Sequence, residues 1–472
     1  MVCTSINSPI FCAIFKTIQH REFFNNLPYF SFFLDNLHFT IESRRWYTNY
    51  IYFGKGGVVM KVVGIVAEYN PFHNGHAYQI QQLREKTNTD YVIVAMSGNF
   101  LQRGVPALCD KYSRAHMALL NGADLVLEIP TLWATASAEY FAGGGVHTLA
   151  ATGVLTHLGF GAETESIDTL QQITAVLKSE PEVYRKVLSN SIRSGNPFPV
   201  ARKNALITTL PNIPIDELDN LLNSPNNILA LEYLKTLPND ITPVLVQRKG
   251  ANYHDTELNT EFPSASAIRE AILGENAKDS LEMIAQAMPE DAFDILKEHY
   301  EKGSLITSND ISDVLGYCLL CLTHRGYDTF ADCTPDLSNK IRNHLCEYAT
   351  FDDFVMTLKS KDLTHSRISR CLLHILLNIK QVDYNIGKAL GYAPYLRVLG
   401  FKKDASELLS AVNEKSSVPV ITKVASADKV LDYETYKIFE RDILASNLFY
   451  QRTANKSHTK PVNEFTHQMV MI

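Results

Sequence analysis

The chain has 472 residues, of which 46% are hydrophobic and 20% are charged, an ordinary composition for a globular protein of two or three domains. Its formal net charge of -7 argues against broad nonspecific binding of nucleic acid, although a local basic face could still hold RNA. The eight cysteines lack the spacing of a disulfide framework and the start lacks a secretory signal pattern, so we expect a reducing, cytoplasmic protein. Neither composition nor spacing indicates an oligomeric state.

The first 59 residues differ from the rest of the chain. They are rich in Phe, Tyr and Asn without a sustained period, and Asp35 interrupts their most apolar part, so we expect no membrane span. One interpretation is a targeting or regulatory arm. The other is a non-native extension, because the residues from Lys55 to Val58 can be encoded by AAAGGAGGTG, a ribosome-binding sequence read in frame. On that hypothesis Met60 is the true start.

From Met60 onward, short β-branched runs alternate with longer amphipathic segments, which is typical of an α/β domain with a Rossmann-like, doubly wound parallel sheet. The expected strands are Val62–Ala67, Tyr91–Met96, Ala123–Ile129, Thr156–Gly161 and Ile241–Gln247. The expected helices are His76–Thr87, Tyr112–Asn121, Ser137–Ala151, Ser166–Leu177 and Ile228–Thr236. Ligands bind beyond the carboxyl ends of the strands in such sheets, so we expect a catalytic domain over residues 60–275 with its site at that edge.

The stretch KVVGIVAEYNPFHNGHAYQ, residues 61–79, joins the first expected strand to the first helix. Gly75 would let backbone approach a ligand, and the N–H groups at a helix start favour an anion such as phosphate. A lone pair such as His73 and His76 is ordinarily a core or zinc-ligand pair, but no third ligand of HExxH type accompanies it, so we expect no metal site. Imidazoles at this turn would stabilise charge on the phosphates of ATP.

Residues 276–472 are expected to form a second, mostly helical domain. Ser264 can cap the helix that leads into it, and the segment THSRISRCLLHILLNI places Arg367 and Arg370 on one helical face. These arginines, with Arg397 nearby in sequence, are candidate contacts to the phosphate backbone of RNA, and a solvated basic face is an equally open alternative. We expect the polar tail after Asn455 to be loosely ordered.

The ordered motifs of the chain resemble a known family. The strand followed by an H-x-G-H turn is similar to the nucleotidyltransferase superfamily, and the match to the tRNA(Met) cytidine acetate ligase family is closer. It extends from Met60 to about Phe401 through GIVAEYNPFHNGH, MSGNFLQRGVPA, NGADLVLEIP, FGAE, SPNNILALEY, RKGANYHD and SASAIR, followed by SRISR and YLRVLGF, which we expect to be helical. The stretch before Met60 has no counterpart in the family pattern.

The resemblance implies an enzyme that activates acetate with ATP to acetyl-adenylate and pyrophosphate. The acetyl group then passes to N4 of the wobble cytidine of elongator tRNA(Met), forming N4-acetylcytidine. ATP, with Mg2+, would be a substrate, and no prosthetic group or membrane is implied. The implied ATP contacts are Val66, Ala67, Glu68, Tyr69, Asn70, Pro71, Phe72, His73, Asn74, Gly75, His76, Ala77, Tyr78, Gln79, Gly161, Asn226, Arg248 and Lys249. The family often has a small apolar residue at Lys249, which favours a backbone contact there.

Within this set we expect His73 and His76 to be catalytic and Asn74 to hold the adenylate. Ser264, Ser266 and Arg269 stand where related enzymes carry a Ser/Thr and Lys signature, so they are candidate phosphate ligands. Without the resemblance, we would interpret Gly161 as a turn glycine, Asn226 as a helix cap and Arg248 as a surface cation. Two rival functions stay open, a small-molecule adenylyl- or cytidylyltransferase and a noncatalytic nucleotide- or RNA-binding adaptor.

Overall fold

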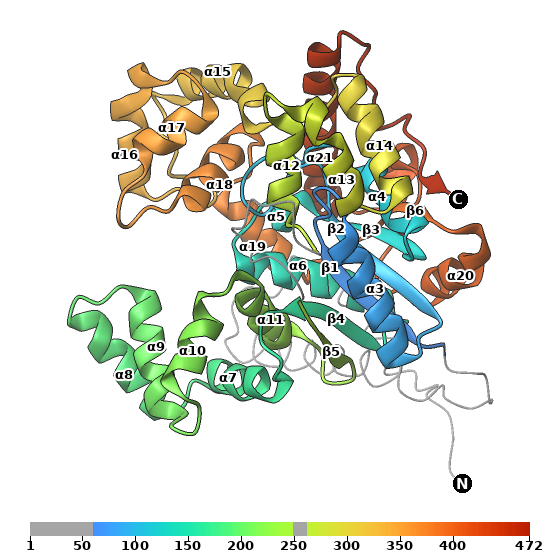
Figure 1. Cartoon of the computed structure of the whole chain (residues 1–472). Coiled ribbons are helices and arrows are strands. Elements are labelled where there is room, and N and C mark those ends of the chain that lie inside the picture. Colours follow the sequence, from blue (N-terminus) through green and yellow to red (C-terminus); the bar gives the residue numbers. More distant parts are fainter. Residues whose placement is uncertain (1–59, 249–261) are drawn as a thin grey trace, which may run out of the picture. The chain divides into compact units, whose positions relative to one another are not determined.

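The computed structural model describes residues 60–248 and 262–472, and the sheet is its central element (Figure 1). The described strands form one eight-stranded sheet in the order β5-β4-β1-β2-β3-β6-β7, with β8 pairing to β6. The expected N-terminal extension, residues 1–59, and the expected ATP contact Lys249 lie outside the described residues, so both stay predictions.

Five parallel strands form the expected half of this sheet. They are β1 Val62–Ala67, β2 Tyr91–Ser97, β3 Leu125–Ile129, β4 His157–Ala162 and β5 Thr242–Gln247. β1 lies between β2 and β4 and is parallel to both. Val62 and Val63 point to opposite faces of the sheet and both are 0% exposed, so β1 is buried on both faces, which explains its continuous apolar run. The expected α/β class and parallel sheet are therefore confirmed.

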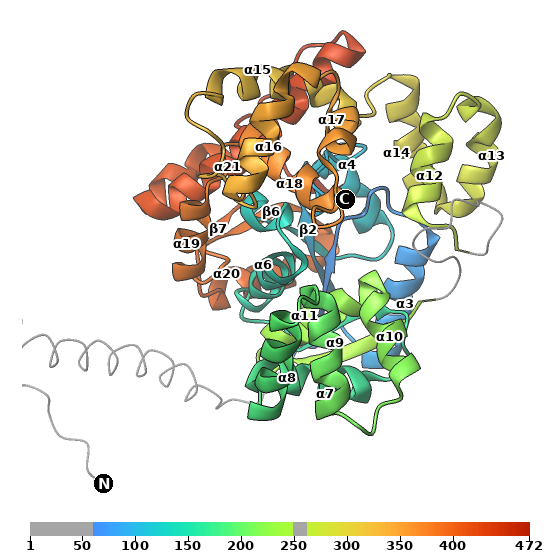
Figure 2. The same cartoon turned by 90° about the vertical axis from the view of Figure 1, so that its left-hand side faces the viewer.

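Helices follow the strands as the sequence predicts. The five expected helices are α3 Asn74–Thr87, α4 Lys111–Leu120, α6 Ala138–Ala150, α7 Ile167–Ser179 and α11 Pro225–Thr236. The sequence did not predict the helices inserted between them: α5 Thr131–Ala134, α8 Glu182–Arg193, α9 Phe198–Thr209 and α10 Ile215–Asn223. Figure 2 shows α7 to α10 gathered beside α11, away from the C-terminal helices.

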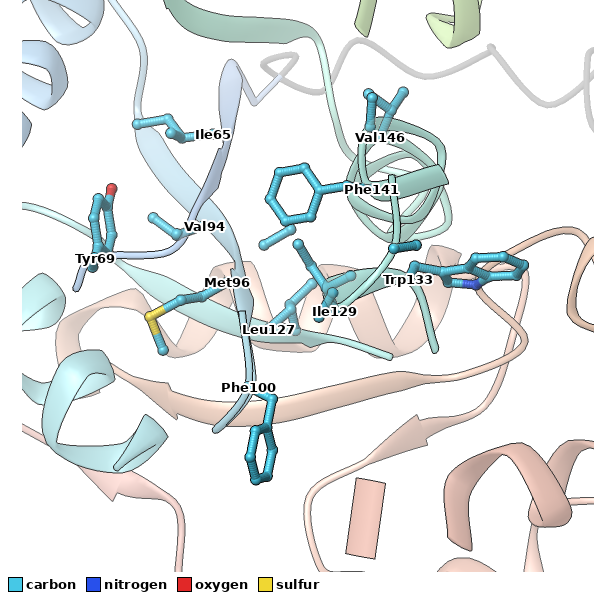
Figure 3. Packing of buried hydrophobic residues seen from close by; sticks show 14 of the residues in the cluster. Ile65, Tyr69, Val94, Met96, Phe100, Leu127, Ile129, Trp133, Phe141 and Val146 are labelled. Atoms are coloured by element: carbon cyan, nitrogen blue, oxygen red, sulfur yellow. The ribbon is translucent and has the colours of Figure 1, made fainter. Parts of the chain in front are cut away.

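The core of the sheet is apolar and closely packed (Figure 3). Ile65 of β1, Val94 of β2 and Leu127 of β3 are at most 1% exposed. Trp133 of α5 is fully buried, and its indole N–H donates to the carbonyl of Tyr392 at 2.6 Å. This contact joins the helices beside the parallel strands to the C-terminal part of the chain.

The expected helical region follows. Its helices are α12 Ala265–Leu273, α13 Ala277–Ala287, α14 Glu290–Glu301, α15 Ser312–Leu322, α16 Pro335–His344, α17 Phe351–Leu358, α18 His365–Leu376, α19 Gln381–Ala389, α20 Ser406–Lys415 and α21 Tyr433–Ser457, with short 3-10 turns η1 Ser308–Ile311, η2 Leu345–Glu347, η3 Lys403–Ala405 and η4 Val424–Lys429.

This region also returns to the sheet. The YLRVLGF stretch, expected to be helical, forms β6, Leu396–Phe401, and pairs antiparallel with β3. β7, Val420–Ile421, and β8, Val470–Met471, pair parallel with β6. Residues 60–472 form one compact unit, so the boundary expected near residue 275 does not separate the sheet from the helices that follow it.

The tail after Asn455 is ordered, contrary to expectation. α21 continues to Ser457, Glu464 is fully buried, and β8 adds a strand next to β6. Glu464 explains the difference, because its carboxylate accepts from Arg397 at 2.7 Å and lies 2.6 Å from the ammonium of Lys111. These ion pairs hold the tail in place, although its polar sequence suggested that it would be loosely ordered.

Four charged residues form what we call the core ion cluster: Lys111, Glu128, Arg397 and Glu464. Lys111 lies 2.7 Å and Arg397 lies 3.1 Å from Glu128 Oε2, and all four side chains are at most 4% exposed. Burial alone would lower the pKa of Lys111, but the carboxylates of Glu128 and Glu464 raise it above its usual range. Arg397 is 3% exposed and faces this cluster, so the expected tRNA contact at Arg397 is wrong.

Candidate nucleotide-binding site

The predicted ATP contacts lie at the carboxyl end of β1. Val66 and Ala67 end the strand, residues 68–72 form the turn, His73 is the N-cap of α3, and residues 74–79 are its first turns. The Asn70–Pro71 peptide bond is cis, and Tyr69 has a positive φ of 49°. The turn therefore brings the end of a buried strand and the start of a helix to one point.

Arg114 of α4 fixes this edge of the sheet, and the sequence did not single it out. Its guanidinium is fully buried and donates to the carbonyls of Glu68 at 2.6 Å and of Ser97 and Cys109 at 3.1 Å, and also to that of Gly98. The carboxyl ends of β1 and β2 thus share one cation. A single arginine at helical spacing gave no signal of this contact, because its acceptors are backbone groups.

The two histidine rings pack closely at the start of α3, with an angle of 34° between their planes. Their ring centroids are 3.8 Å apart, and the ring of His76 also packs against Tyr69 at 4.7 Å and Phe72 at 5.5 Å. His73 Nδ1 accepts from the Gly75 N–H at 3.0 Å, and His76 Nδ1 accepts from the His73 N–H at 3.2 Å. Both Nδ1 atoms are acceptors, so each neutral ring carries its proton on Nε2.

The histidines are neutral in the ligand-free protein. Burial, together with the nearby cations Arg248 and Arg269, lowers the pKa of His73 to about 3. Burial, the neighbouring His73 and then Arg248 lower the pKa of His76 well below its usual range. The pair thus offers two Nε2–H donors without adding charge, next to cations that do attract an anion.

The candidate phosphate ligands of α12 lie beside the turn. Arg269 donates to the Asn70 carbonyl at 2.6 Å and to Ser266 Oγ at 2.9 Å. Ser264 is the N-cap of α12 and accepts from the Ala267 N–H at 3.0 Å, as the sequence predicts. The start of a second helix therefore stands next to the start of α3, and both favour an anion.

The remaining predicted ATP contacts come from β4, β5 and α11. Arg248 directly follows β5, and a methyl group at Gly161 would lie 3.4 Å from Arg248 Cγ and 3.8 Å from Gln79 Nε2. Asn226, the second residue of α11, donates from Nδ2 to Glu163 Oε1 at 2.7 Å. This hydrogen bond fixes the orientation of the Asn226 amide. The second polar atom of that amide is its Oδ1.

Asn74 and the two remaining arginines differ in surroundings. Asn74 Nδ2 donates to the Gln286 carbonyl of α13 at 2.7 Å, which holds this amide against the helical region. On α18, Arg370 is 12% exposed and lies 2.9 Å from Asp332 Oδ2, while Arg367 is partly exposed. Their roles in binding the adenylate and tRNA stay predictions, and Arg367 is the better placed of the two arginines.

Two kinds of feature are absent from the described ranges, 60–248 and 262–472. No helix there is long and apolar enough to cross a membrane. Nor do three or more His, Cys, Asp or Glu residues there gather as a metal-binding group.

Comparisons with known proteins agree with this geometry. Residues 60–464 match the family model described as HIGH Nucleotidyl Transferase. A Thermoanaerobacter tRNA(Met) cytidine acetate ligase is 39% identical over 402 residues, which are 84% of this chain and 97% of the relative. The Acetivibrio thermocellus enzyme of that name is 34% identical over 418 residues, 88% of this chain and 100% of the relative.

Solved structures of Thermotoga maritima TmcAL extend the likeness to the fold. The apo form has a TM-score of 0.81 at 31% identity and covers 88% of this chain and 100% of its own. A form bound with alpha-thio ATP has a TM-score of 0.80 at 31% identity and covers 87% and 99%. The chain therefore belongs to the tRNA(Met) cytidine acetate ligase family of HIGH nucleotidyl transferases.

Proposed function

We propose that this protein activates acetate with ATP and transfers the acetyl group to N4 of the wobble cytidine of elongator tRNA(Met), forming N4-acetylcytidine. The observation that carries the proposal is the pair of neutral imidazoles at the start of α3, with Nε2–H donors beside Arg248 and Arg269. Family membership supplies the substrates, because the relatives bear the name tRNA(Met) cytidine acetate ligase.

In the first step, an acetate oxygen attacks the α-phosphorus of ATP and pyrophosphate leaves. Negative charge grows on the phosphate oxygens, and fixed donors stabilise that charge most when they need no reorganisation. His73 and His76 are held by their Nδ1 hydrogen bonds, so their Nε2–H groups are such donors. Arg269, fixed by Asn70 and Ser266, would grip the departing pyrophosphate.

Mg2+ would enter with ATP. This ion commonly keeps several waters and binds through substrate phosphates and one or two carboxylates rather than through a dedicated protein cage. The ion would neutralise phosphate charge, while the protein orients the reacting groups.

The nucleoside would lie along the ends of β4 and β5. Gly161 has no side chain to fill the space in front of Arg248 and Gln79. Asn226, oriented by Glu163, can contact the base or the ribose. In the second step α18, with Arg367 partly exposed, would contact the tRNA backbone and bring the cytidine to the adenylate.

The test is incubation with labelled acetate, ATP and bulk tRNA. We expect label in N4-acetylcytidine, and we expect His76→Ala to lower its rate by about 10²–10³-fold, the usual cost of removing one such donor. His344→Ala is the matched control, because this partly exposed histidine pairs with Glu347 on the surface. Label on an adenylylated metabolite, or no turnover at all, would instead support the first or the second rival function.

A further inference from the structure

Glu68 is a carboxylate in a turn that otherwise favours anions. It directly follows β1 and is partly exposed. Arg114 holds its carbonyl at 2.6 Å, and its Oε1 accepts from the Gln102 N–H at 2.8 Å. Arg114 thus fixes the backbone of Glu68, and Gln102 fixes its side chain. A negative charge here opposes binding of a triphosphate, so its presence calls for another role.

The other carboxylates at this edge are engaged elsewhere. Glu128 belongs to the core ion cluster, and Glu163 accepts from the Asn226 side chain and the Asn227 N–H. Asp110 caps α4 through two backbone N–H groups. Within the described residues, the Glu68 carboxylate accepts through Oε1 alone, which leaves Oε2 for a ligand.

The loop between β2 and α4 connects Glu68 to the helix expected to contact RNA. Gln102 in this loop donates to Glu68, and two residues later Gly104, with φ 79°, lies against the backbone of α18. A methyl group at Gly104 would come within 2.3 Å of the Arg370 nitrogen. Arg103, between them, is exposed. Burial is the main cause that lowers the pKa of His365 at the start of α18, and the charges of Lys359 and Arg103 add to it. A nucleotide held along α18 would therefore reach the turn from the side of Glu68.

We propose that Glu68 is a catalytic residue of the second step, accepting the proton of the cytidine N4 amine. This inference rests on the proposed function. The N4 lone pair attacks the carbonyl carbon of acetyl-adenylate and a C–N bond forms. The N4 proton passes to Glu68 Oε2 and from there to water. The bond between the acyl carbon and the phosphate oxygen then breaks and AMP leaves.

A base is needed because this amine is a poor nucleophile. Its lone pair is delocalised into the cytosine ring, so attack produces a strongly acidic nitrogen that departs more easily than AMP. Removing the proton commits the intermediate to product. General bases contribute about 10²–10⁴-fold to such steps.

The test is Glu68→Gln, with the two half-reactions measured separately. Glutamine can still accept from the Gln102 N–H, so the loop contact is kept while the proton acceptor is lost. We expect acetyl transfer to tRNA to fall by about 10²–10⁴-fold, and acetate-dependent exchange of pyrophosphate into ATP, in which Glu68 is a predicted ATP contact, to fall far less. Glu68→Asp keeps a carboxylate at this position and should restore part of the transfer rate. Glu85→Gln on the exposed side of α3 is the control.

Each other outcome is informative. Wild-type transfer by Glu68→Gln would overturn the inference, and so would an equal loss in both half-reactions, which would place Glu68 in the first step or on Mg2+. Absence of acetate-dependent exchange in the wild-type protein would instead overturn the proposed function, and the inference with it.

Discussion

The variant Arg397→Met tests whether Arg397 stabilises the core or contacts tRNA at the surface, as the sequence suggested. The substitution keeps the aliphatic stem but leaves Lys111 alone against two buried carboxylates. Removing one partner of a buried ion pair costs about 3–5 kcal/mol. For about 400 described residues, an unfolding entropy near 2.1 cal/mol/K per residue converts this loss into a fall of about 4–6 °C in Tm.

Differential scanning calorimetry measures that fall. Filter binding at a temperature where the variant is folded should give the wild-type affinity for tRNA, because Arg397 is 3% exposed. The double variant Arg397→Met, Glu464→Gln removes one charge of each sign and leaves Lys111 paired with Glu128 at 2.7 Å. It should therefore lose less stability than the sum of the two single variants. Weaker tRNA binding at an unchanged Tm would refute this account of Arg397.

Three further predictions follow from the site and its surroundings. Arg367→Met should weaken tRNA binding and reduce its salt slope by about 1 with Tm unchanged, whereas an unchanged slope would exclude a phosphate contact. Gly104→Ala should slow acetyl transfer more than pyrophosphate exchange, because the added methyl group displaces α18 from the loop, and equal rates would contradict this. His73 titrates near pH 3 when folded and near 6.5 when unfolded, so the unfolded state binds more protons between these values. Stability in urea titrations should therefore fall as pH drops from 6.5 toward 3, and His73→Asn should remove part of this dependence.

The parallel strands and their helices could be predicted because their signals are local. An apolar run of six residues such as Val62–Ala67, four of them β-branched, is itself evidence of burial, and so is the amphipathic period of α4. The H-x-G-H turn was likewise readable, because strand, turn and helix start are adjacent in the chain. These features needed no knowledge of distant residues.

What the sequence did not reveal depends on partners far along the chain. β6 has an apolar pattern that suits a helix or a strand, and its pairing with β3 decides between them. The sequence does not distinguish Arg397 from Arg367, yet Arg397 lies in the core and Arg367 lies partly at the surface. The role of Arg114 could not be predicted from the sequence, because its partners are four backbone carbonyls rather than an acidic side chain.

The buried position of Glu464 has a consequence for synthesis on the ribosome. Lys111 and Glu128 emerge early, but at about 5–20 residues per second Glu464 follows them only after roughly 20–70 s. Arg397 also emerges late, so for most of that time Lys111 and Glu128 have neither Arg397 nor Glu464 beside them, next to the strands that carry the nucleotide site. Chains that end between residues 397 and 464 would leave Lys111 and Arg397 short of one carboxylate partner, and we expect them to be less stable than chains that contain Glu464.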